Sequence, residues 1–291
     1  MKPERHSFKR TVKLLISAGF YFGTCARNLF LRMVGVKPRF GCVVLYYHSV
    51  PTETRGRFAR QMDAVARLTK PIDANPHSPL DPGVRYSAIT FDDAFENAIE
   101  NALPELRKRN IPATIFVTTN VLGERARWWP EQASERTATI ASEKQIKELP
   151  TDLVNIGSHT LSHRMLPLLS EAEARRELSE SRAKLEEMLR HPVTTLSFPF
   201  GAFNEDLVHM CRDAGYERVF TTLPVMAFGN GEFVTGRVPA EPTDWPLEFR
   251  LKLVGAYRWL PYAFAIKKRL LSTAWVRRHR AIGNGAEQSV S

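Results

Sequence analysis

The chain has 291 residues, of which 43% are hydrophobic and 25% charged, and its formal net charge is +10 at pH 7. This composition is typical of a globular protein with one sizeable core. No hydrophobic run approaches the ~20 residues of an uninterrupted membrane-spanning helix, which excludes a conventional multi-span membrane protein. The three cysteines are too few and too widely spaced for a disulfide framework or a Cys-x-x-Cys zinc site.

The positive charge is concentrated at the two ends of the chain. Residues 1–40 have a net charge of +8 and residues 246–291 a net charge of +7, whereas residues 41–245 have a net charge of −5. A nucleic-acid enzyme is expected to place Lys and Arg around its catalytic groove, where the phosphates lie. We therefore expect no nucleic-acid partner, and we divide the chain into a central catalytic domain, 41–245, and two basic terminal segments.

The first predicted element is an amphipathic helix within residues 1–40. Residues 14–26 carry no charge, and basic residues lie on both sides of them. A basic start followed by a short apolar core also fits a cleaved signal peptide, which would export the protein to the periplasm. The basic residues downstream oppose translocation. We therefore expect a retained helix on the cytoplasmic face of a bacterial inner membrane, with export or simple packing on the domain as alternatives.

Residues 41–245 alternate short apolar runs with helical patterns. Ser142 with Gln145, and Ser170 with Glu173, form capping boxes that start two of the helices. The expected strands are 42–47, 88–91, 113–118, 153–156, 196–198 and 219–221, and the expected helices are 58–68, 95–109, 142–149, 170–190 and 205–214. Repeated units of this kind indicate an α/β protein with parallel strands, and at this length they favour a distorted (β/α) barrel.

The last segment, 246–291, interleaves aromatic and aliphatic residues with Lys and Arg. This pattern is typical of helices that lie at a membrane interface. A second weak signal of this kind would make attachment to a membrane surface more stable. The alternative is that these helices cover hydrophobic surface of the domain. Residues 283–291 have the composition of a disordered tail.

Two adjacent carboxylates, Asp92 and Asp93, directly follow the expected strand 88–91. Two buried carboxylates repel each other unless a cation or a shared proton relieves the repulsion. Catalytic groups of (β/α) barrels lie where the strands end, so both residues are candidates for catalysis or metal binding. The structural alternative is that Asp93 caps the helix that follows.

A pair of histidines, His159 and His163, follows the expected strand 153–156. One helical turn would place both imidazoles on the same face, where they could bind one divalent ion. With Asp93 as a third ligand, the metal would keep coordination positions open for water, as metals in catalytic rather than structural sites do. The histidine pair alone is a weak signal, and the strand-end Asp-Asp pair strengthens it.

The order of four motifs resembles the polysaccharide deacetylases, carbohydrate esterase family 4, which share the NodB homology domain. The motifs are Thr-Phe-Asp-Asp at 90–93, Pro-Ala-Thr-Ile-Phe-Val at 112–117, Gly-Ser-His-Thr-Leu-Ser-His at 157–163 and Ser-Phe-Pro-Phe-Gly at 197–201. The resemblance extends from about residue 43 to residue 222. It implies a distorted, NodB-like barrel that holds a divalent metal, usually zinc.

The resemblance also implies roles for the charged motif residues. Asp93, His159 and His163 would hold the metal, and Asp92 would be the general base that activates a water molecule. These roles agree with the chemistry of the residues, because a divalent metal lowers the pKa of water to ~7 and a neighbouring carboxylate completes the proton transfer. Amide hydrolysis then becomes feasible near neutral pH.

Other roles that the resemblance implies fall on the fourth motif and on the first strand. The backbone N–H of Phe200 would stabilise the oxyanion, with Pro199 and Gly201 beside it in the substrate site. The usual C-terminal Leu-x-His motif, which supplies the general acid, is absent. In some members of the family, a Tyr-His pair at the end of the first strand takes the place of this motif. Tyr47-His48 resembles that arrangement, so His48 is our candidate for the general acid. The alternative is that His48 has no catalytic role and only forms hydrogen bonds within the turn that follows the strand.

Two further positions depart from the family pattern. Ala94 stands where the first motif usually ends in Gly, which is tolerable if the backbone there is not at positive φ. Ser197 stands where the family commonly has an Arg that orients the base. Arg237, which precedes another apparent strand end, is our candidate to supply that guanidinium from elsewhere.

These observations predict a metal-dependent hydrolase that removes N-acetyl groups from amino sugars of a polysaccharide or lipid-linked glycan. The basic ends suggest a role in bacterial surface polysaccharide synthesis. O-acetyl and formyl groups remain alternative targets. The alternative from another functional class is a catalytically impaired glycan-binding protein on the same fold, because Ser197 replaces the motif Arg and the C-terminal Leu-x-His motif is absent.

Overall fold

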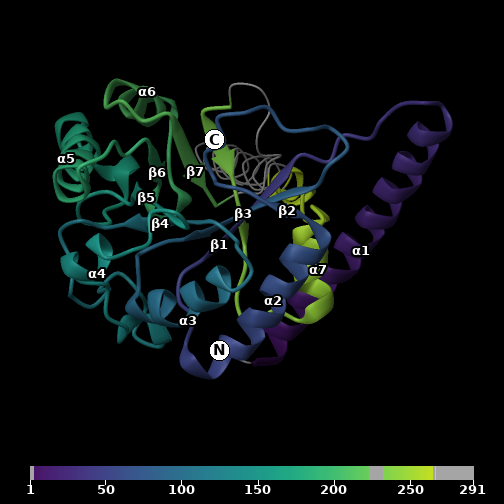
Figure 1. Cartoon of the computed structure of the whole chain (residues 1–291), viewed down its shortest axis with the longest axis horizontal. Helices are drawn as coiled ribbons and strands as arrows, with labels where there is room; N and C mark the ends of the chain where they lie inside the picture. Colours follow the sequence, from purple (N-terminus) through teal and green to yellow (C-terminus); the bar gives the residue numbers. More distant parts are fainter. Residues whose placement is uncertain (1–2, 223–231, 265, 267–291) are drawn as a thin grey trace, which may run out of the picture.

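The computed structural model describes residues 3–222, 232–264 and 266. Within these residues the central domain forms one parallel sheet that is rolled into a nearly closed barrel (Figure 1). Its strands are β1 (Cys42–Tyr47), β2 (Lys70–Pro71), β3 (Tyr86–Phe91), β4 (Ala113–Val117), β5 (Val154–Ser158), β6 (Thr195–Ser197), β7 (Arg218–Thr221), β8 (Val234–Gly236) and β9 (Val238–Pro239). The predicted (β/α) barrel is confirmed.

The barrel closes through the segment that contains β8 and β9. The strand order is β8-β7-β6-β5-β4-β3-β1-β9, so the last two strands lie at opposite ends of the path. β8 pairs with β7, and β9 pairs with β1. Only Arg237 separates the two strands. One extended segment therefore joins both edges of the sheet and leaves Arg237 at the junction.

Alternation along the strands separates two apolar layers, because successive side chains of a strand point to opposite faces. Leu45 and Tyr47 of β1 belong to the main core, which the sheet shares with the surrounding helices. Val44 belongs to a smaller cluster inside the barrel with Phe116 of β4 and Phe220 of β7. The barrel interior is therefore packed with apolar side chains at this level.

Helices cover the outside of the barrel (Figure 1). They are α2 (Arg55–Leu68), α3 (Glu96–Arg107), α4 (Glu143–Lys147), α5 (Glu171–Leu189), α6 (Glu205–Asp213) and α7 (Pro246–Leu253), with short 3-10 turns at Thr52–Thr54, Ser134–Arg136, Leu166–Leu168 and Pro199–Gly201. Both predicted capping boxes, at Ser142 and Ser170, are confirmed.

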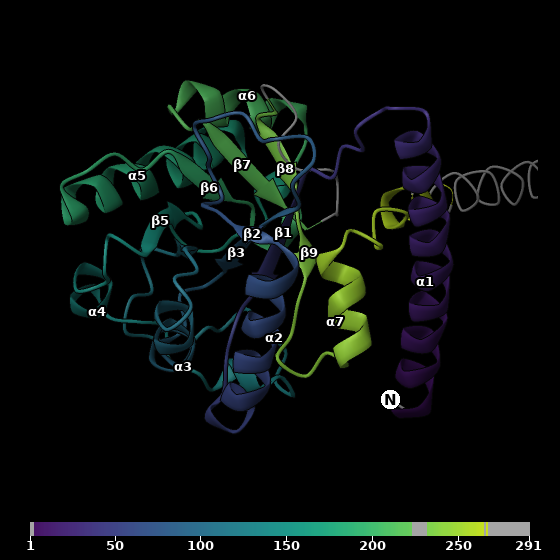
Figure 2. The same ribbon diagram turned by 45° about the vertical axis from the view of Figure 1, so that its right-hand side comes forward.

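The N-terminal helix α1 (Pro3–Met33) lies along the outside of the domain beside α7 (Figure 2). Arg10 of α1 donates to Glu248 of α7 at 2.6 Å. Further along the helix, the indole N–H of Trp259 donates to Ser17 Oγ at 2.9 Å. Specific polar contacts therefore attach one face of α1 to the domain.

The opposite face of α1 is apolar and exposed. Phe8, Leu15, Phe22, Leu29 and Met33 recur at the spacing of one helix face, and their exposed fractions range from 61% to 71%. By length and composition alone, residues 8–33 could cross a membrane, although signal sequences and soluble core helices pass the same test. Residues 8–33 contain basic residues, so this helix does not contradict the exclusion of a conventional multi-span membrane protein.

The predicted C-terminal helices are described only as far as residue 266. The first of them, α7, packs against the domain, because Phe249, Leu251 and Leu253 are buried in the main core. This packing favours the alternative interpretation of the segment, in which it covers hydrophobic surface. Residues 267–291, including the predicted tail at 283–291, lie outside the described residues.

Candidate active site

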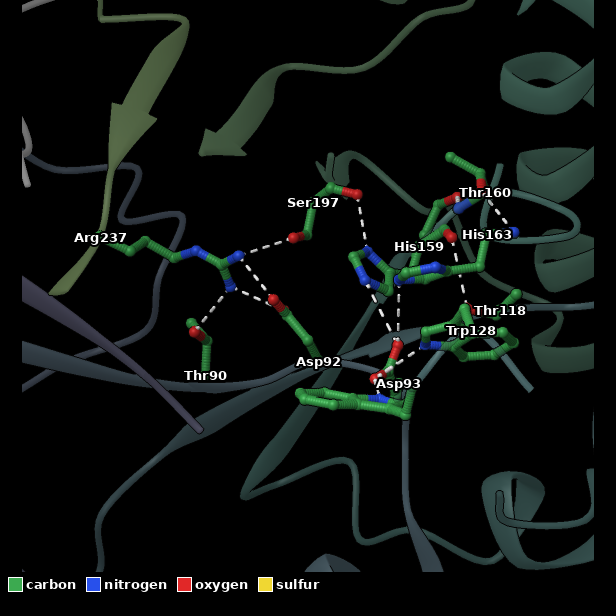
Figure 3. A network of polar contacts seen from close by, with 12 residues as sticks. Thr90, Asp92, Asp93, Thr118, Trp128, His159, Thr160, His163, Ser197 and Arg237 are labelled. Carbon is green, nitrogen blue, oxygen red and sulfur yellow. Dashed lines mark hydrogen bonds and ion pairs between the residues drawn. The ribbon is translucent and has the colours of Figure 1, made fainter. Parts of the chain in front are cut away.

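The candidate site lies at the carboxyl ends of neighbouring strands (Figure 3). Asp92 and Asp93 directly follow β3, His159 directly follows β5, and Ser197 ends β6. Arg237 reaches the same place from the junction of β8 and β9. Catalytic groups of (β/α) barrels lie at this end of the strands, so the fold brings the predicted residues together where chemistry is expected.

Asp93, His159 and His163 form the centre of the site, which we call the Asp-His-His site. Their candidate ligand atoms all lie within 4.8 Å of one another, and all three residues are buried. The Nε2 atoms of His159 and His163 lie 3.5 and 3.4 Å from Asp93 Oδ1. Three side chains from separate parts of the chain therefore converge on one point.

A hydrogen bond decides which nitrogen of His159 is free to bind a metal. His159 Nδ1 lies 2.8 Å from the carbonyl oxygen of Ser197. A carbonyl oxygen can only accept, so Nδ1 carries the proton and donates it. Nε2 of the neutral ring then presents a lone pair toward Asp93. Histidines that bind metals commonly donate their other N–H in this way.

His163 is held in its neutral form. Its pKa is lowered to about 2, first by burial and then by the neighbouring His159. Its ring stacks on that of Trp128, with the centroids 4.2 Å apart. A neutral imidazole is the form that binds metals, so the surroundings of His163 suit a ligand rather than a proton carrier.

The spacing of the Asp-His-His site fits a divalent metal. Two ligands that each lie ~2.1 Å from a tetrahedral zinc ion are separated by about 3.4 Å, and the two His–Asp separations are 3.4 and 3.5 Å. Asp93 Oδ1 is buried and accepts no hydrogen bond from the described residues. A bound cation would compensate the negative charge of this buried oxygen. Two imidazoles with one carboxylate are a ligand set that catalytic zinc sites use.

A loop, rather than the predicted helical turn, brings the histidines together. Thr160 and His163 have positive φ angles of 67° and 58°. The buried carboxylate of Glu177, on α5, accepts hydrogen bonds from the N–H groups of Leu161 and Ser162, both at 3.0 Å. These contacts hold a strained backbone of the kind that clusters at functional sites. No pattern in the sequence distinguishes Glu177 from the solvated glutamates of the same amphipathic helix, so its role could not be predicted.

Arg237 contacts both Asp92 and Ser197 inside the end of the barrel. Its Nη1 and Nη2 donate to the two carboxylate oxygens of Asp92, each at 2.7 Å, and Nη2 also donates to Ser197 Oγ at 2.7 Å. Burial raises the pKa of Asp92, but the charge and hydrogen bonds of Arg237, together with the neighbouring His159 and His48, outweigh burial and hold that pKa well below its usual value. Asp92 is therefore ionised at neutral pH, as a general base must be.

The guanidinium of Arg237 is fully buried. It lies 4.7 Å from the ring centroid of Tyr46, 5.4 Å from that of Phe116 and 5.8 Å from that of Phe220. Nη1 also donates to Thr90 Oγ1 at 3.1 Å. Aromatic faces and charged hydrogen bonds together compensate the burial of this cation.

The start of α3 corrects two expectations. Phe95 occupies the N-cap position without a side-chain capping bond, so Asp93 does not cap this helix. Asp93 and Ala94 both have positive φ angles, 67° and 55°. The condition for tolerating alanine at position 94 is therefore not met, and this conformation costs a residue with a Cβ ~1–2 kcal/mol. Burial of the Ala94 methyl group in the core offsets part of that cost.

Two adjacent tryptophans orient Asp93, and the sequence analysis missed them. Nε1 of Trp129 donates to Asp93 Oδ2 at 3.0 Å, and Nε1 of Trp128 approaches the same oxygen at 3.4 Å. Both residues lie in the long loop between β4 and α4, where no periodicity of a strand or helix marks them. Two consecutive tryptophans in a charged loop are the signal that could have identified them.

His48 and Phe200 lie beside the Asp-His-His site. The half-buried His48 ring packs edge-on against Trp129, with the centroids 4.9 Å apart. The half-exposed Phe200 ring packs edge-on against His163, with the centroids 4.7 Å apart. The structure therefore places both residues near the site, and their roles as general acid and oxyanion donor stay predictions.

Pro199 and Gly201 shape the turn that carries Phe200. Pro199 is buried. Gly201 has a φ of 66°, and a Cβ at this position would collide with the side chain of Thr222. Both residues therefore have a clear structural role, and their contact with substrate stays a prediction.

The fold and the site together define a (β/α) barrel protein with a candidate metal site at the carboxyl ends of its strands. The family model for polysaccharide deacetylases matches residues 80–219. A Bacillus subtilis (strain 168) protein named as a polysaccharide deacetylase, YxkH, is 28% identical over 162 residues, 55% of this chain and 53% of its own length. The match to the polysaccharide deacetylase family therefore covers the part of the chain that carries Asp92, Asp93, His159 and His163.

Two further relatives extend the comparison. The poly-β-1,6-N-acetyl-D-glucosamine N-deacetylase of Staphylococcus aureus (strain MSSA476) is 30% identical over 142 residues, 46% of each chain. The structure of IcaB from Ammonifex degensii aligns with a TM-score of 0.62 and 25% identity over 74% of this chain and 98% of that one. The matches span about half the length of the Bacillus and Staphylococcus proteins.

Replacing Arg237 by Gln tests the buried ion pair. The low pKa of Asp92 contributes stability that is present above the pKa of an unfolded aspartate, about 3.9, and is lost as the pH falls through the folded value. Without the guanidinium, burial raises the pKa of Asp92, so protonation begins at a higher pH. We expect the free energy of unfolding at neutral pH to fall by about 3–5 kcal/mol, as measured by urea denaturation.

The matched control for this variant is Arg175→Gln, which removes an exposed arginine from surface ion pairs with Glu171 and Asp213. We expect its stability to change by less than about 1 kcal/mol. Equal stabilities of the two variants, with the same dependence on pH, would contradict the assigned role of Arg237.

Replacing Trp129 by Phe tests the orientation of Asp93. The ring is retained, but the indole N–H that donates to Asp93 Oδ2 is lost. Loss of such an outer partner typically weakens metal binding about 10- to 100-fold, and a zinc titration followed by calorimetry measures the affinity. Trp245→Phe, outside the site, is the control. Unchanged affinity in both variants would show that Trp129 does not position the ligand.

Proposed function

We propose that this protein is a metal-dependent hydrolase that removes N-acetyl groups from amino sugars of a bacterial polysaccharide or lipid-linked glycan. The observation that carries the proposal is the convergence of Asp93, His159 and His163 next to the ion pair of Asp92 with Arg237. The printed name of the Staphylococcus aureus relative supports an N-acetylated amino sugar as the substrate unit. Zinc is the metal that the ligand set and its spacing favour.

The residues of the site divide the work of amide hydrolysis. Asp93, His159 and His163 would hold the metal, which when bound supplies a Lewis acid and lowers the pKa of a water molecule. Asp92 accepts the proton of the attacking water, and Arg237 keeps its carboxylate ionised and in place. A base that is oriented in this way has no rotational freedom to lose during the reaction.

The remaining steps concern the carbonyl oxygen and the leaving amine. The backbone N–H of Phe200 donates to the oxyanion that forms when water adds to the acetyl carbon. His48 donates a proton to the sugar nitrogen as the C–N bond breaks. The products are acetate and the free amino sugar, so that the atoms of one water molecule are divided between them.

The competing interpretation, a catalytically impaired glycan-binding protein, rested on Ser197 in place of an arginine and on the absence of the C-terminal Leu-x-His motif, for which His48 is our candidate replacement. Arg237 donates to both Ser197 and Asp92. The base therefore has its guanidinium partner, and the substitution no longer argues against catalysis.

Release of acetate from an oligomer of N-acetylglucosamine tests the proposal. We expect the zinc-loaded protein to release acetate, Asp92→Asn to keep zinc but lose about 10²- to 10⁴-fold in rate, and His163→Ala to lose both zinc and activity. His209→Ala, an exposed histidine of α6, is the control and should change neither. O-acetylated and N-formylated sugars assayed in parallel identify the group removed. Zinc binding without release of acetate from any substrate would instead support the binding protein.

We also propose that α1 is retained and attaches the protein to the cytoplasmic face of the inner membrane. The apolar outer face of the helix supports insertion into a bilayer interface. The contacts of Arg10 with Glu248 and of Trp259 with Ser17 support retention over cleavage, because removing α1 would leave these partners without their hydrogen bonds. Export to the periplasm is the alternative.

Substitutions on the outer face of α1 test this attachment better than removal of residues 1–40, which would also remove packing against α7. We expect Leu15→Gln with Phe22→Gln to move the protein from the membrane fraction to the soluble fraction while acetate release is kept. The control pair is Met165→Gln with Leu168→Gln, which are exposed elsewhere. Protease digestion of inside-out vesicles should degrade the wild-type protein, whereas protection in these vesicles would indicate export.

A further inference from the structure

A cleft that is separate from the Asp-His-His site is lined by residues of α2, α7 and the N-terminal half of α1. Figure 2 shows α7 between α2 and α1. The volume of the cleft is about 810 Å³. Five arginines contribute to its wall: Arg57, Arg60 and Arg67 from α2, Arg250 from α7 and Arg10 from α1. Three helices that are distant in sequence therefore direct guanidinium groups toward one space.

The two carboxylates in the wall of this arginine cleft accept hydrogen bonds from residues outside the arginine set. Asp63 accepts a hydrogen bond from Arg109 at 2.7 Å. Asp244 accepts from Lys252 at 2.8 and 2.7 Å and lies 3.7 Å from Arg10, which also pairs with Glu248. Arg10 is therefore neutralised within the protein, whereas neither carboxylate forms an ion pair with Arg57, Arg60 or Arg250 in the part of the chain that the structure describes.

Three of the arginines have no polar partner of their own. The side chains of Arg57, Arg60 and Arg250 make no hydrogen bond or ion pair with any residue in the part of the chain that the structure describes. Like charges on neighbouring turns of a helix destabilise it, so the arrangement carries a cost that a bound anion would remove. Guanidinium groups match phosphate oxygens in pairs, and arginine is therefore the common residue for phosphate recognition.

The cleft also borders the surface that we assign to the membrane. α1 contributes Arg10 to the cleft and exposes Phe8 and Leu15 on its outer face. Trp245 and Leu247, at the start of α7, are 40% and 56% exposed. A helix is only ~10–12 Å across, so a bilayer that receives the apolar face of α1 brings its headgroups close to the cleft.

The cleft runs along α2 from Arg57 in its first turn to Arg67 in its last turn, so it begins at the same end of the barrel as the Asp-His-His site. α2 begins shortly after the carboxyl end of β1, and α7 begins shortly after that of β9. Arg57 and Trp245 lie near the starts of these helices. A ligand held here is thus on the side of the barrel where a sugar would be deacetylated.

We propose that the arginine cleft binds a phosphate ester at the membrane surface. The phosphate could belong to an anionic phospholipid headgroup or to the linkage between a glycan substrate and its lipid carrier. Either source would hold the catalytic end of the barrel against the membrane. Phosphate binding of this kind is a function separate from deacetylation. It depends on the arginines of the cleft that are unpaired among the described residues and on the membrane attachment that we propose for α1.

Vesicle binding of the full chain tests this site. The cleft variant is Arg57→Gln/Arg60→Gln/Arg250→Gln, and the control is Arg107→Gln/Lys147→Gln/Arg176→Gln, which loses the same charge from exposed ion pairs. The vesicles contain phosphatidylcholine alone, phosphatidylcholine with phosphatidylglycerol, or phosphatidylcholine with a polyprenyl diphosphate. Each arginine at an anionic surface contributes about fivefold in binding, so we expect a loss of about 100-fold in the cleft variant and far less in the control.

The pattern of losses identifies the source of the phosphate. A loss confined to phosphatidylglycerol vesicles indicates headgroups, and a loss confined to polyprenyl diphosphate vesicles indicates the lipid carrier. Equal binding by the cleft variant and the control, or wild-type binding that is the same for all three vesicles, would overturn the proposal. Acetate release from a soluble oligosaccharide should be the same in the cleft variant and the wild type, so failure here is distinguishable from failure of the proposed activity.

Discussion

The site depends on three ligand atoms, from Asp93, His159 and His163, that converge within 4.8 Å of one another in a buried place. Asp93 Oδ1 is buried and receives no hydrogen bond from the described residues. His159 directs its Nε2 toward that oxygen, because its Nδ1 is committed to the Ser197 carbonyl. An arrangement of this kind is unfavourable in a buried place unless a cation compensates it. Trp129 and Glu177 maintain the arrangement from outside, one through the carboxylate and the other through the histidine loop.

Arg237 lies where the barrel closes, and the same residue pairs with the carboxylate of Asp92. Arg237 separates the strand that pairs with β7 from the strand that pairs with β1. From this junction its guanidinium reaches Asp92 and Ser197 inside the end of the barrel. A residue of the closing segment can therefore replace an arginine that the family usually carries on another strand, because both positions face the same interior.

Much of the fold and the chemistry of the site could be predicted from the sequence. The strands β1 and β3 to β7 were predicted from short apolar runs, whereas the short strands β2, β8 and β9 were not. Asp93, His159 and His163 were identified by their residue types and their places after strands. The geometry around them could not be predicted. The backbone at Ala94 and His163 adopts positive φ, which only the surrounding packing imposes. Trp129 and Glu177 act through single hydrogen bonds over long sequence separations, which no local pattern records.

The most direct test of the central claim is a crystal structure of the zinc-loaded protein with anomalous scattering data collected at the zinc absorption edge. The account predicts one strong peak bonded to Asp93 Oδ1, His159 Nε2 and His163 Nε2, with at least one further position open to water. A map without a peak at this place, or a peak bonded to other side chains, would contradict it.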